Sequence, residues 1–420
     1  MGAGAFIEPL VVISLLVGGT LVNKERRPAP DPAYDPIKSG GSSPRDGLFS
    51  PSSQSRSPSP EYPTEGRRTR TIRVVGWQKE IHTPNTEQFS NRLLSRLLRK
   101  FPFLVEVWYW ALIYWVYQLG RAFTALTLVE GTVHTARKHA LQVIHLEERL
   151  QIFWEPAIQG FFLQHPEVMR WINRIYSFIH IPGTILFLIW LFYITVTVNR
   201  TPDAYLPLAK RPGSVERSPG GSALYQARRR TMAMCNLIAF VVFTLWPCMP
   251  PRLLSDPEYH GPDSAEAKSF GFVDTVHGAE GESSVWTQNK FCNQYAAMPS
   301  LHFGYSLLIG LTIALIPLAS QEHSGRFIRI RRFRLRLPTF RRLLCVVIGF
   351  AYPATILTAI IATANHFILD AVAGGIVCGI AWNAETFLLN LLPLEDCFLW
   401  CLRIHKPNVD DTYDSAYDRF

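Results

Sequence analysis

The chain has 420 residues, of which 48% are hydrophobic and 18% charged, and its mean hydropathy of +0.09 averages long apolar blocks against very polar ones. This profile is typical of a membrane protein and argues against an ordinary soluble domain. The formal net charge of +9 is explained by basic loops that face the cytoplasm and anionic lipid, so we expect no nucleic-acid partner.

Seven windows are apolar and long enough to cross a hydrocarbon core about 30 Å thick, which takes roughly 20 residues. They are residues 5–22, 104–128, 177–198, 231–247, 299–319, 343–364 and 367–392. The fourth window is the shortest and the second contains Arg121, so we count six or seven spans. The sequence therefore predicts an all-α fold, a polytopic transmembrane helical bundle.

Basic residues predict the orientation of this bundle, because cytoplasmic loops retain Lys and Arg. The loop at 320–342 contains eight arginines. The clusters at Arg228–Arg230, at Arg99 and Lys100, and after the first span agree with an N-terminus outside and a C-terminus inside. Residues 1–23 are predicted to be an uncleaved anchor, since their charges follow the apolar run.

Polar segments flank the predicted membrane domain at 99–392. Residues 24–98 are rich in Ser, Pro and Arg and contain few large apolar side chains, so they are predicted to be a disordered cytoplasmic segment. The cytoplasmic tail at 393–420 is short, acidic towards its end, and predicted to be loose.

A different pattern lies between residues 130 and 172, where apolar side chains recur at helical spacing among charges. Leu141, Ile144, Leu150 and Phe153 belong to this pattern, which Pro156 interrupts. It predicts an amphipathic helix in the outer membrane interface, beside the mouth of the bundle.

Two features of the loops bear on this topology. Cys248 and Cys292 both fall in a predicted outside loop, where a disulfide is possible. Asn199 begins a glycosylation sequon, but the topology places it inside, so it should be unused.

The stretch "AMPSLH", residues 297–302, begins the fifth predicted span with polar groups. Pro299 suits a first helical position, and Ser300 lies beside the free amides of that first turn. Such amides form an anion site. His302 lies further into the span. The alternative is a helix cap and a buried histidine that a neighbour satisfies.

A second stretch, "NHFILDAVAG", begins the seventh span at residue 365. His366 and Asp370 are four residues apart on one helical face, so the carboxylate can orient the imidazole as a nucleophile. Ionisable groups are costly inside a span and indicate function. The alternative is a helix start at Asn365 with packing glycines at 375 and 379.

The predicted topology brings these motifs together, because the fifth and seventh spans both run from outside to inside. His302, Ser300, His366 and Asp370 should therefore lie at similar depth in one leaflet. Arg252, in "WPCMPPRLL", closes the fourth span on the same side and can donate paired hydrogen bonds to a phosphate. It can equally be an arginine that snorkels to the interface.

"AMPSLH" followed by "NHFILDAVAG" resembles the type 2 phosphatidic acid phosphatase superfamily, specifically the inositolphosphotransferase branch that includes the fungal inositol phosphorylceramide synthase. The resemblance covers residues 104–392 and includes "HLEERLQIFWEPAIQ". It implies that His366 attacks phosphorus, that Asp370 orients it, that His302 transfers protons, and that Ser300 holds phosphate oxygens. It implies no metal or other cofactor.

The sequence departs from the superfamily in its phosphate-binding cations. The third motif normally begins Ser-Arg, but Ala359 and Ile360 stand at those positions. The Lys-x6-Arg-Pro first motif is also absent as such. Arg252 is our predicted substitute, and Arg121 is a second candidate.

The leading interpretation is a membrane enzyme that moves a phosphoryl or phospho-alcohol group of a lipid in the lumenal or outer leaflet. The acceptor is water or a lipid hydroxyl such as that of ceramide. The site belongs to the endomembrane system, Golgi or ER, or to the plasma membrane. The alternative is a catalytically weak or inactive scaffold that binds a lipid headgroup. The sequence names no protein partner.

Overall fold

The computed structural model describes residues 4–25, 67–74, 76–127, 131–198, 220–257, 260–261, 263–276, 295–318, 327–330, 333–336 and 338–407. The sequon at Asn199, Cys292, residues 26–66 of the segment predicted to be disordered, and the end of the tail lie outside these ranges.

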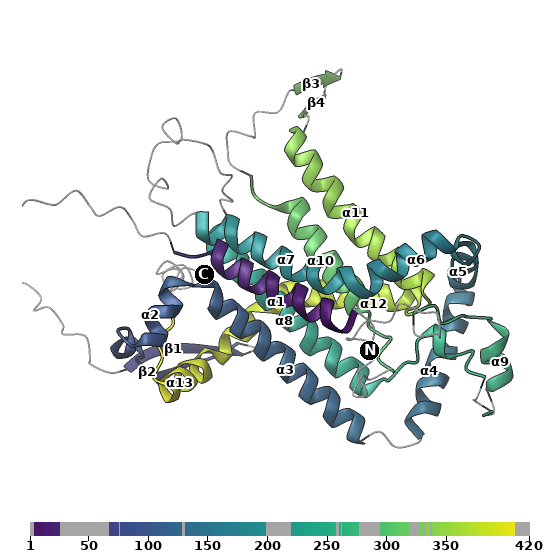
Figure 1. Ribbon diagram of the computed structural model, residues 1–420, viewed down its shortest axis with the longest axis horizontal. Coiled ribbons are helices and arrows are strands. Elements are labelled where there is room, and N and C mark those ends of the chain that lie inside the picture. Colours follow the sequence, from purple (N-terminus) through teal and green to yellow (C-terminus); the bar gives the residue numbers. More distant parts are fainter. Residues whose placement is uncertain are drawn as a thin grey trace, which may run out of the picture.

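Helices account for most of the described chain (Figure 1). They are α1 (Gly4–Val22), α2 (Leu93–Lys100), α3 (Phe103–Thr127), α4 (Gly131–Arg149), α5 (Glu155–Leu163), α6 (Pro166–Arg174), α7 (His180–Phe192), α8 (Gly221–Leu245), α9 (Ser264–Ser269), α10 (Leu301–Leu315), α11 (Phe340–Ala362), α12 (Ile368–Ala384) and α13 (Leu392–Leu402). Two π-helical turns, η2 (Ile175–Ile179) and η3 (Tyr193–Thr197), extend α7 at both ends, and a 3-10 turn, η9 (Glu385–Leu391), joins α12 to α13. The strands are β1 (Arg67–Val74), β2 (Trp77–Pro84), β3 (Phe327–Ile330) and β4 (Phe333–Arg336).

Every predicted span coincides with a helix. Three stretches among the described residues are long and apolar enough to cross a membrane, namely His180–Thr197, Phe340–Ala362 and Ile368–Leu402. The apolar helices Pro9–Val22 and Leu301–Leu315 are shorter, and α3 and α8 are each 25 residues long. These findings confirm the predicted all-α membrane bundle.

Helix α8 begins ten residues before its predicted span and includes the arginines that we assigned to a loop. Arg229 donates to both carboxylate oxygens of Glu106 on α3, at 2.8 and 2.7 Å. Arg230 pairs with Glu385, the first residue of η9. These ion pairs allow the arginines to enter the helix because a buried charge is tolerated when it has a partner.

Helices α10, α11 and α12 approach one another at glycines. A Cβ on Gly310 would collide with the carbonyl oxygen of Gly349 on α11, and a Cβ on Gly374 of α12 would collide with the carbonyl oxygen of Ser300. Small residues permit this approach in membranes, where helices associate mainly by van der Waals packing. Of the two glycines predicted to pack, Gly375 lies at ordinary van der Waals distance from side chains of α10, whereas the prediction was wrong for Gly379, which faces open space.

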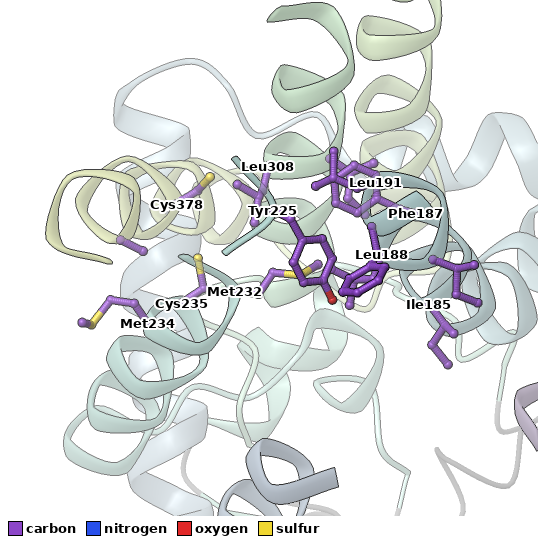
Figure 2. Close-up of a cluster of buried hydrophobic side chains, with 14 of the residues drawn as sticks. Ile185, Phe187, Leu188, Leu191, Tyr225, Met232, Met234, Cys235, Leu308 and Cys378 are labelled. Carbon is purple, nitrogen blue, oxygen red and sulfur yellow. The ribbon is translucent and has the colours of Figure 1, made fainter. Parts of the chain in front are cut away.

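The largest buried cluster joins side chains of α1, α3, α7, α8, α10 and α12. Figure 2 shows side chains from α7, α8, α10 and α12 meeting there, with Tyr225 of α8 beside the α7 residues. Phe192 packs edge-on against Tyr225, with ring centroids 5.0 Å apart. This packing fixes α10 and α12, which carry predicted site residues, against α7 and α8.

The predicted amphipathic segment forms α4, α5 and α6, which gather with α9 at one end of the bundle (Figure 1). Leu141 and Ile144 of α4 are buried in a cluster with Cys248, Ala297 and Phe367. The apolar face of α4 therefore packs on the loops that hold the site. Leu150, by contrast, is 54% exposed.

The prediction of disorder was wrong for residues 67–98, which form the β1–β2 hairpin and most of α2. The hairpin pairs in antiparallel register from Arg67 with Pro84 to Val74 with Trp77. Its Arg70 binds both carboxylate oxygens of Asp396, at 2.8 and 3.2 Å, and Thr83 donates to the same carboxylate. The composition of the segment could not reveal this partner, which lies 326 residues away.

The prediction of a loose tail also needs correction. The start of the tail is not loose, since Leu392–Leu402 form α13, whose Asp396 and Glu395 bind Arg70 and Lys406. The possible disulfide of Cys248 stays a prediction, because Cys292 lies outside the described residues; Cys248 itself is buried, and its Sγ lies 3.8 Å from the Met249 carbonyl oxygen.

Candidate active site

The start of α10 carries Ser300 and His302. Ser300 is the N-cap and is fully buried, and its Oγ accepts a hydrogen bond from the Phe303 amide at 3.4 Å. Pro299 therefore lies before the cap, and the prediction that it is the first helical residue was wrong. The amides of Leu301 and His302, in the first turn, have no intrahelical acceptor and can face an anion.

His366 precedes α12 and is held in one tautomer. Its Nδ1 lies 2.8 Å from the carbonyl oxygen of Ala297. A carbonyl only accepts hydrogen bonds, so Nδ1 carries the proton and Nε2 keeps its lone pair. The Oδ2 atom of Asp370 lies 3.5 Å from the same Nδ1 and accepts a hydrogen bond from the Phe367 amide at 2.9 Å.

His302 lies on α10, whereas His366 lies in the link between α11 and α12 and not on the α12 face predicted for it, and the two ring centroids are 5.6 Å apart. A direct backbone link fixes this pairing, since the Ser300 amide donates to the Asp370 carbonyl oxygen at 2.9 Å. The structure thus brings together the four predicted residues His302, Ser300, His366 and Asp370.

Arg252 also reaches this region, but its guanidinium already has partners. Its amide donates to the Ala364 carbonyl oxygen at 2.8 Å, its Nε donates to Asn365 at 2.9 Å, and its Nη1 donates to Asp274 at 2.8 Å. The side chain is 8% exposed. A phosphate at this site would therefore share Arg252 with the carboxylate of Asp274.

The other predicted cation is not placed. Arg121 lies in α3, but its side chain is outside the described part of the chain. Ala359 and Ile360, which stand where an arginine would begin the third motif, are fully buried.

Comparison with known proteins gives one match. The family described as the PAP2 superfamily matches residues 141–202, 221–319 and 335–384, which together are half of the chain. The chain belongs to the PAP2 superfamily. No curated protein and no solved structure matches. Membership of the PAP2 superfamily suggests a membrane phosphatase or phosphotransferase, and the matched segments include every element of the site described above.

Sequence reasoning missed two aromatic neighbours of His302 in this PAP2 domain. The rings of Tyr176 and His180 lie 4.9 and 4.7 Å from the His302 ring, centroid to centroid. His180 is 7% exposed, and its Nδ1 has no partner among the described residues. The presence of a histidine in an apolar span is the sequence signal that could have indicated His180.

Sequence reasoning also missed two buried acids that contact the start of α12. They are Glu147 of α4 and Glu155 of α5. Their spacing in "HLEERLQIFWEPAIQ" shows no direct relation to His366, because α4 and α5 must first fold against α12.

No group of three His, Cys, Asp or Glu side chains within the described ranges is arranged to hold a metal ion. That this PAP2 protein needs no metal or other cofactor stays a prediction.

Proposed function

We propose that the protein is an integral membrane lipid phosphatase or phospho-alcohol transferase that works through a phosphohistidine at His366. The observation that carries the proposal is the meeting of His302 and His366 at the ends of two helices, 5.6 Å apart between ring centroids, with Nε2 of His366 left unprotonated by the Ala297 contact.

In the first step, the Nε2 lone pair of His366 attacks phosphorus. The P–N bond forms while the bond from phosphorus to the leaving oxygen breaks, and His302 donates a proton to that oxygen. The phosphorylated imidazole is cationic when Nδ1 keeps its proton, so the nearby carboxylate of Asp370 stabilises it.

In the second step, His302 removes a proton from the acceptor hydroxyl. The acceptor oxygen attacks phosphorus, the P–N bond breaks, and its electron pair returns to Nε2 of His366. Water as acceptor gives a phosphatase, whereas a lipid hydroxyl such as that of ceramide gives a transferase.

The negative charge on phosphorus needs donors. The first-turn amides of α10, the hydroxyl of Ser300 and the guanidinium of Arg252 are the candidates. Arg121 stays a further candidate from the sequence.

We place this site in the lumenal or outer leaflet of an endomembrane or the plasma membrane, with a phospholipid as the substrate. The basic loop at 320–342 supports this orientation. The resemblance of the paired motifs supports the inositolphosphotransferase branch.

A lipid-binding protein without turnover is the second candidate. It is favoured by the Arg252–Asp274 ion pair, which occupies the cation that would otherwise bind phosphate, and by the absence of an arginine at Ala359 and Ile360.

The test is to incubate purified protein, without divalent metal, with labelled phosphatidate or phosphatidylinositol, alone and with ceramide. Free phosphate and new phospholipid are measured separately for wild type and His366→Ala, with His165→Ala, an exposed histidine, as the matched control. We expect product from wild type and the control but none from His366→Ala. Product from His366→Ala would refute the phosphohistidine, and no product from wild type would favour the binding protein.

A further inference from the structure

Two glutamates from different helices converge on the first turn of α12. The Oε1 atom of Glu155, at the start of α5, accepts a hydrogen bond from the Ile368 amide at 2.8 Å. The Oε1 atom of Glu147, near the end of α4, accepts one from the Leu369 amide at 2.7 Å. The amides are consecutive, so the carboxyl groups lie side by side.

The second oxygens of these carboxyl groups are the unusual feature. Both side chains are completely buried, and Oε2 of each has no hydrogen-bond partner among the described residues. Two ionised carboxylates facing each other in a buried site repel strongly, whereas one proton between them removes the repulsion and satisfies both oxygens.

A third acid completes the arrangement. Asp370 is fully buried and accepts from the Phe367 amide, so the three consecutive amides at 367–369 each donate to a carboxylate. The start of α12 is therefore committed to protein carboxylates and cannot also bind phosphate. The start of α10 is then the helix terminus that faces substrate.

We propose that Glu147 and Glu155 share one proton and act as positioning residues, which hold the first turn of α12 so that His366 points at phosphorus. This inference rests on the proposed function for its catalytic part, whereas the shared proton stands on the contacts alone.

The proton makes the arrangement sensitive to pH. Burial, reinforced by the neighbouring carboxyl group of Glu155, raises the pKa of Glu147 from 4.5 to about 9, and burial also raises the pKa of Glu155. The other ionisable groups that face the pair are Asp370 of α12, whose charge raises both values, and the buried thiol of Cys248. Loss of the proton would place a second full charge beside Asp370 and push the first turn of α12 away.

Glutamine variants separate the proton from the carboxylate. In Glu147→Gln or Glu155→Gln, the amide oxygen can still accept from α12, and the amide N–H can replace the shared proton. In the double glutamine variant, the two side-chain N–H groups face each other. One side chain must therefore turn away, and its hydrogen bond with α12 is lost. Glu148→Gln is the matched control, because Glu148 is the exposed neighbour on α4.

The experiment has two readouts. Difference infrared spectroscopy detects the C=O band of a protonated carboxyl group, and lipid turnover is measured from pH 6 to 10, a range chosen to bracket the raised pKa. We expect the band in wild type and Glu148→Gln at neutral pH and its loss in both single variants. We expect wild-type turnover to fall above about pH 9 and the fall to be absent in Glu147→Gln. The rate of lipid turnover should fall less than about tenfold in each single variant and about 100-fold in the double variant, which is the cost of a small misplacement of the reacting groups.

The outcomes separate the two proposals. A missing wild-type band, or a band that survives in both single variants, would overturn the shared proton whatever the turnover. Turnover of the double variant equal to wild type would overturn the positioning role. Absence of turnover from every variant, with the band behaving as expected, would count against the proposed function and leave the shared proton supported.

Discussion

Replacement of Asp370 by Asn separates two contributions to the reactivity of His366. Asn has the same shape, and its side-chain oxygen can still accept from the Phe367 amide. Its amide nitrogen would replace Oδ1, which has no partner among the described residues. The Ala297 carbonyl oxygen still fixes the tautomer of His366. Asp370→Asn thus removes mainly the negative charge.

The separation of 3.5 Å between Oδ2 and Nδ1 sets the size of the effect. Unit charges at about 4 Å attract by about 4 kcal/mol at an effective dielectric constant of about 20. The imidazole becomes cationic only as the P–N bond forms, so this attraction stabilises the transition state. About 1.4 kcal/mol corresponds to tenfold in rate, so we expect kcat to fall about 1,000-fold.

The assay is single-turnover release of product from labelled lipid in detergent, for wild type, Asp370→Asn and His366→Ala, after each is shown to be folded by circular dichroism. Asp370→Asn should keep a measurable rate, above that of His366→Ala. A rate equal to wild type would refute the electrostatic role, and a rate equal to that of His366→Ala would refute the assignment of the tautomer to Ala297.

Three further results are expected. Gly374→Ala should lower the free energy of unfolding by about 1–3 kcal/mol, because its Cβ meets the Ser300 carbonyl oxygen; thermal unfolding measures this. Asp274→Asn should tighten the binding of vanadate, a phosphate analogue, about tenfold, because loss of one charge-assisted hydrogen bond frees Arg252; titration calorimetry measures it. Stability should fall as pH rises from 4.5 to 9, less steeply in Glu147→Gln, because the unfolded chain releases a proton that the folded protein still holds; thermal unfolding at several pH values measures this.

Each of these has a contrary outcome. Gly379→Ala, in open space on the same helix, is the control for packing, and an equal loss in both alanine variants would contradict the helix contact. Unchanged vanadate affinity in Asp274→Asn would show that Arg252 does not bind phosphate. A stability that rises with pH over this interval would contradict a proton held by the folded protein.

The membrane helices could be predicted from the sequence because hydropathy over about 20 residues is a local property. The neighbourhood of His302 and His366 could also be predicted, since both spans run in the same direction and both motifs begin a span. The structure places these two rings together, and the roles of the residues stay proposals.

Long-range partners explain what the sequence could not reveal. The hairpin at 67–84 depends on Asp396, and the early start of α8 depends on Glu106 and Glu385. Likewise, Glu147 and Glu155 reach the amides of Leu369 and Ile368 only after α4 and α5 fold onto α12. From composition alone, a charged residue in such a segment is expected to be exposed to solvent. Its partner comes near only when the chain folds.

The most direct test of the central claim is to trap the covalent intermediate. Wild-type protein and His366→Ala are incubated briefly with phosphatidate labelled in its phosphate, quenched in alkali and digested, and labelled peptides are identified by mass spectrometry. We expect an acid-labile, alkali-stable phosphate on the peptide that contains His366, absent from the variant. Release of labelled phosphate by wild type with no label on that peptide, or the same label in His366→Ala, would contradict the account.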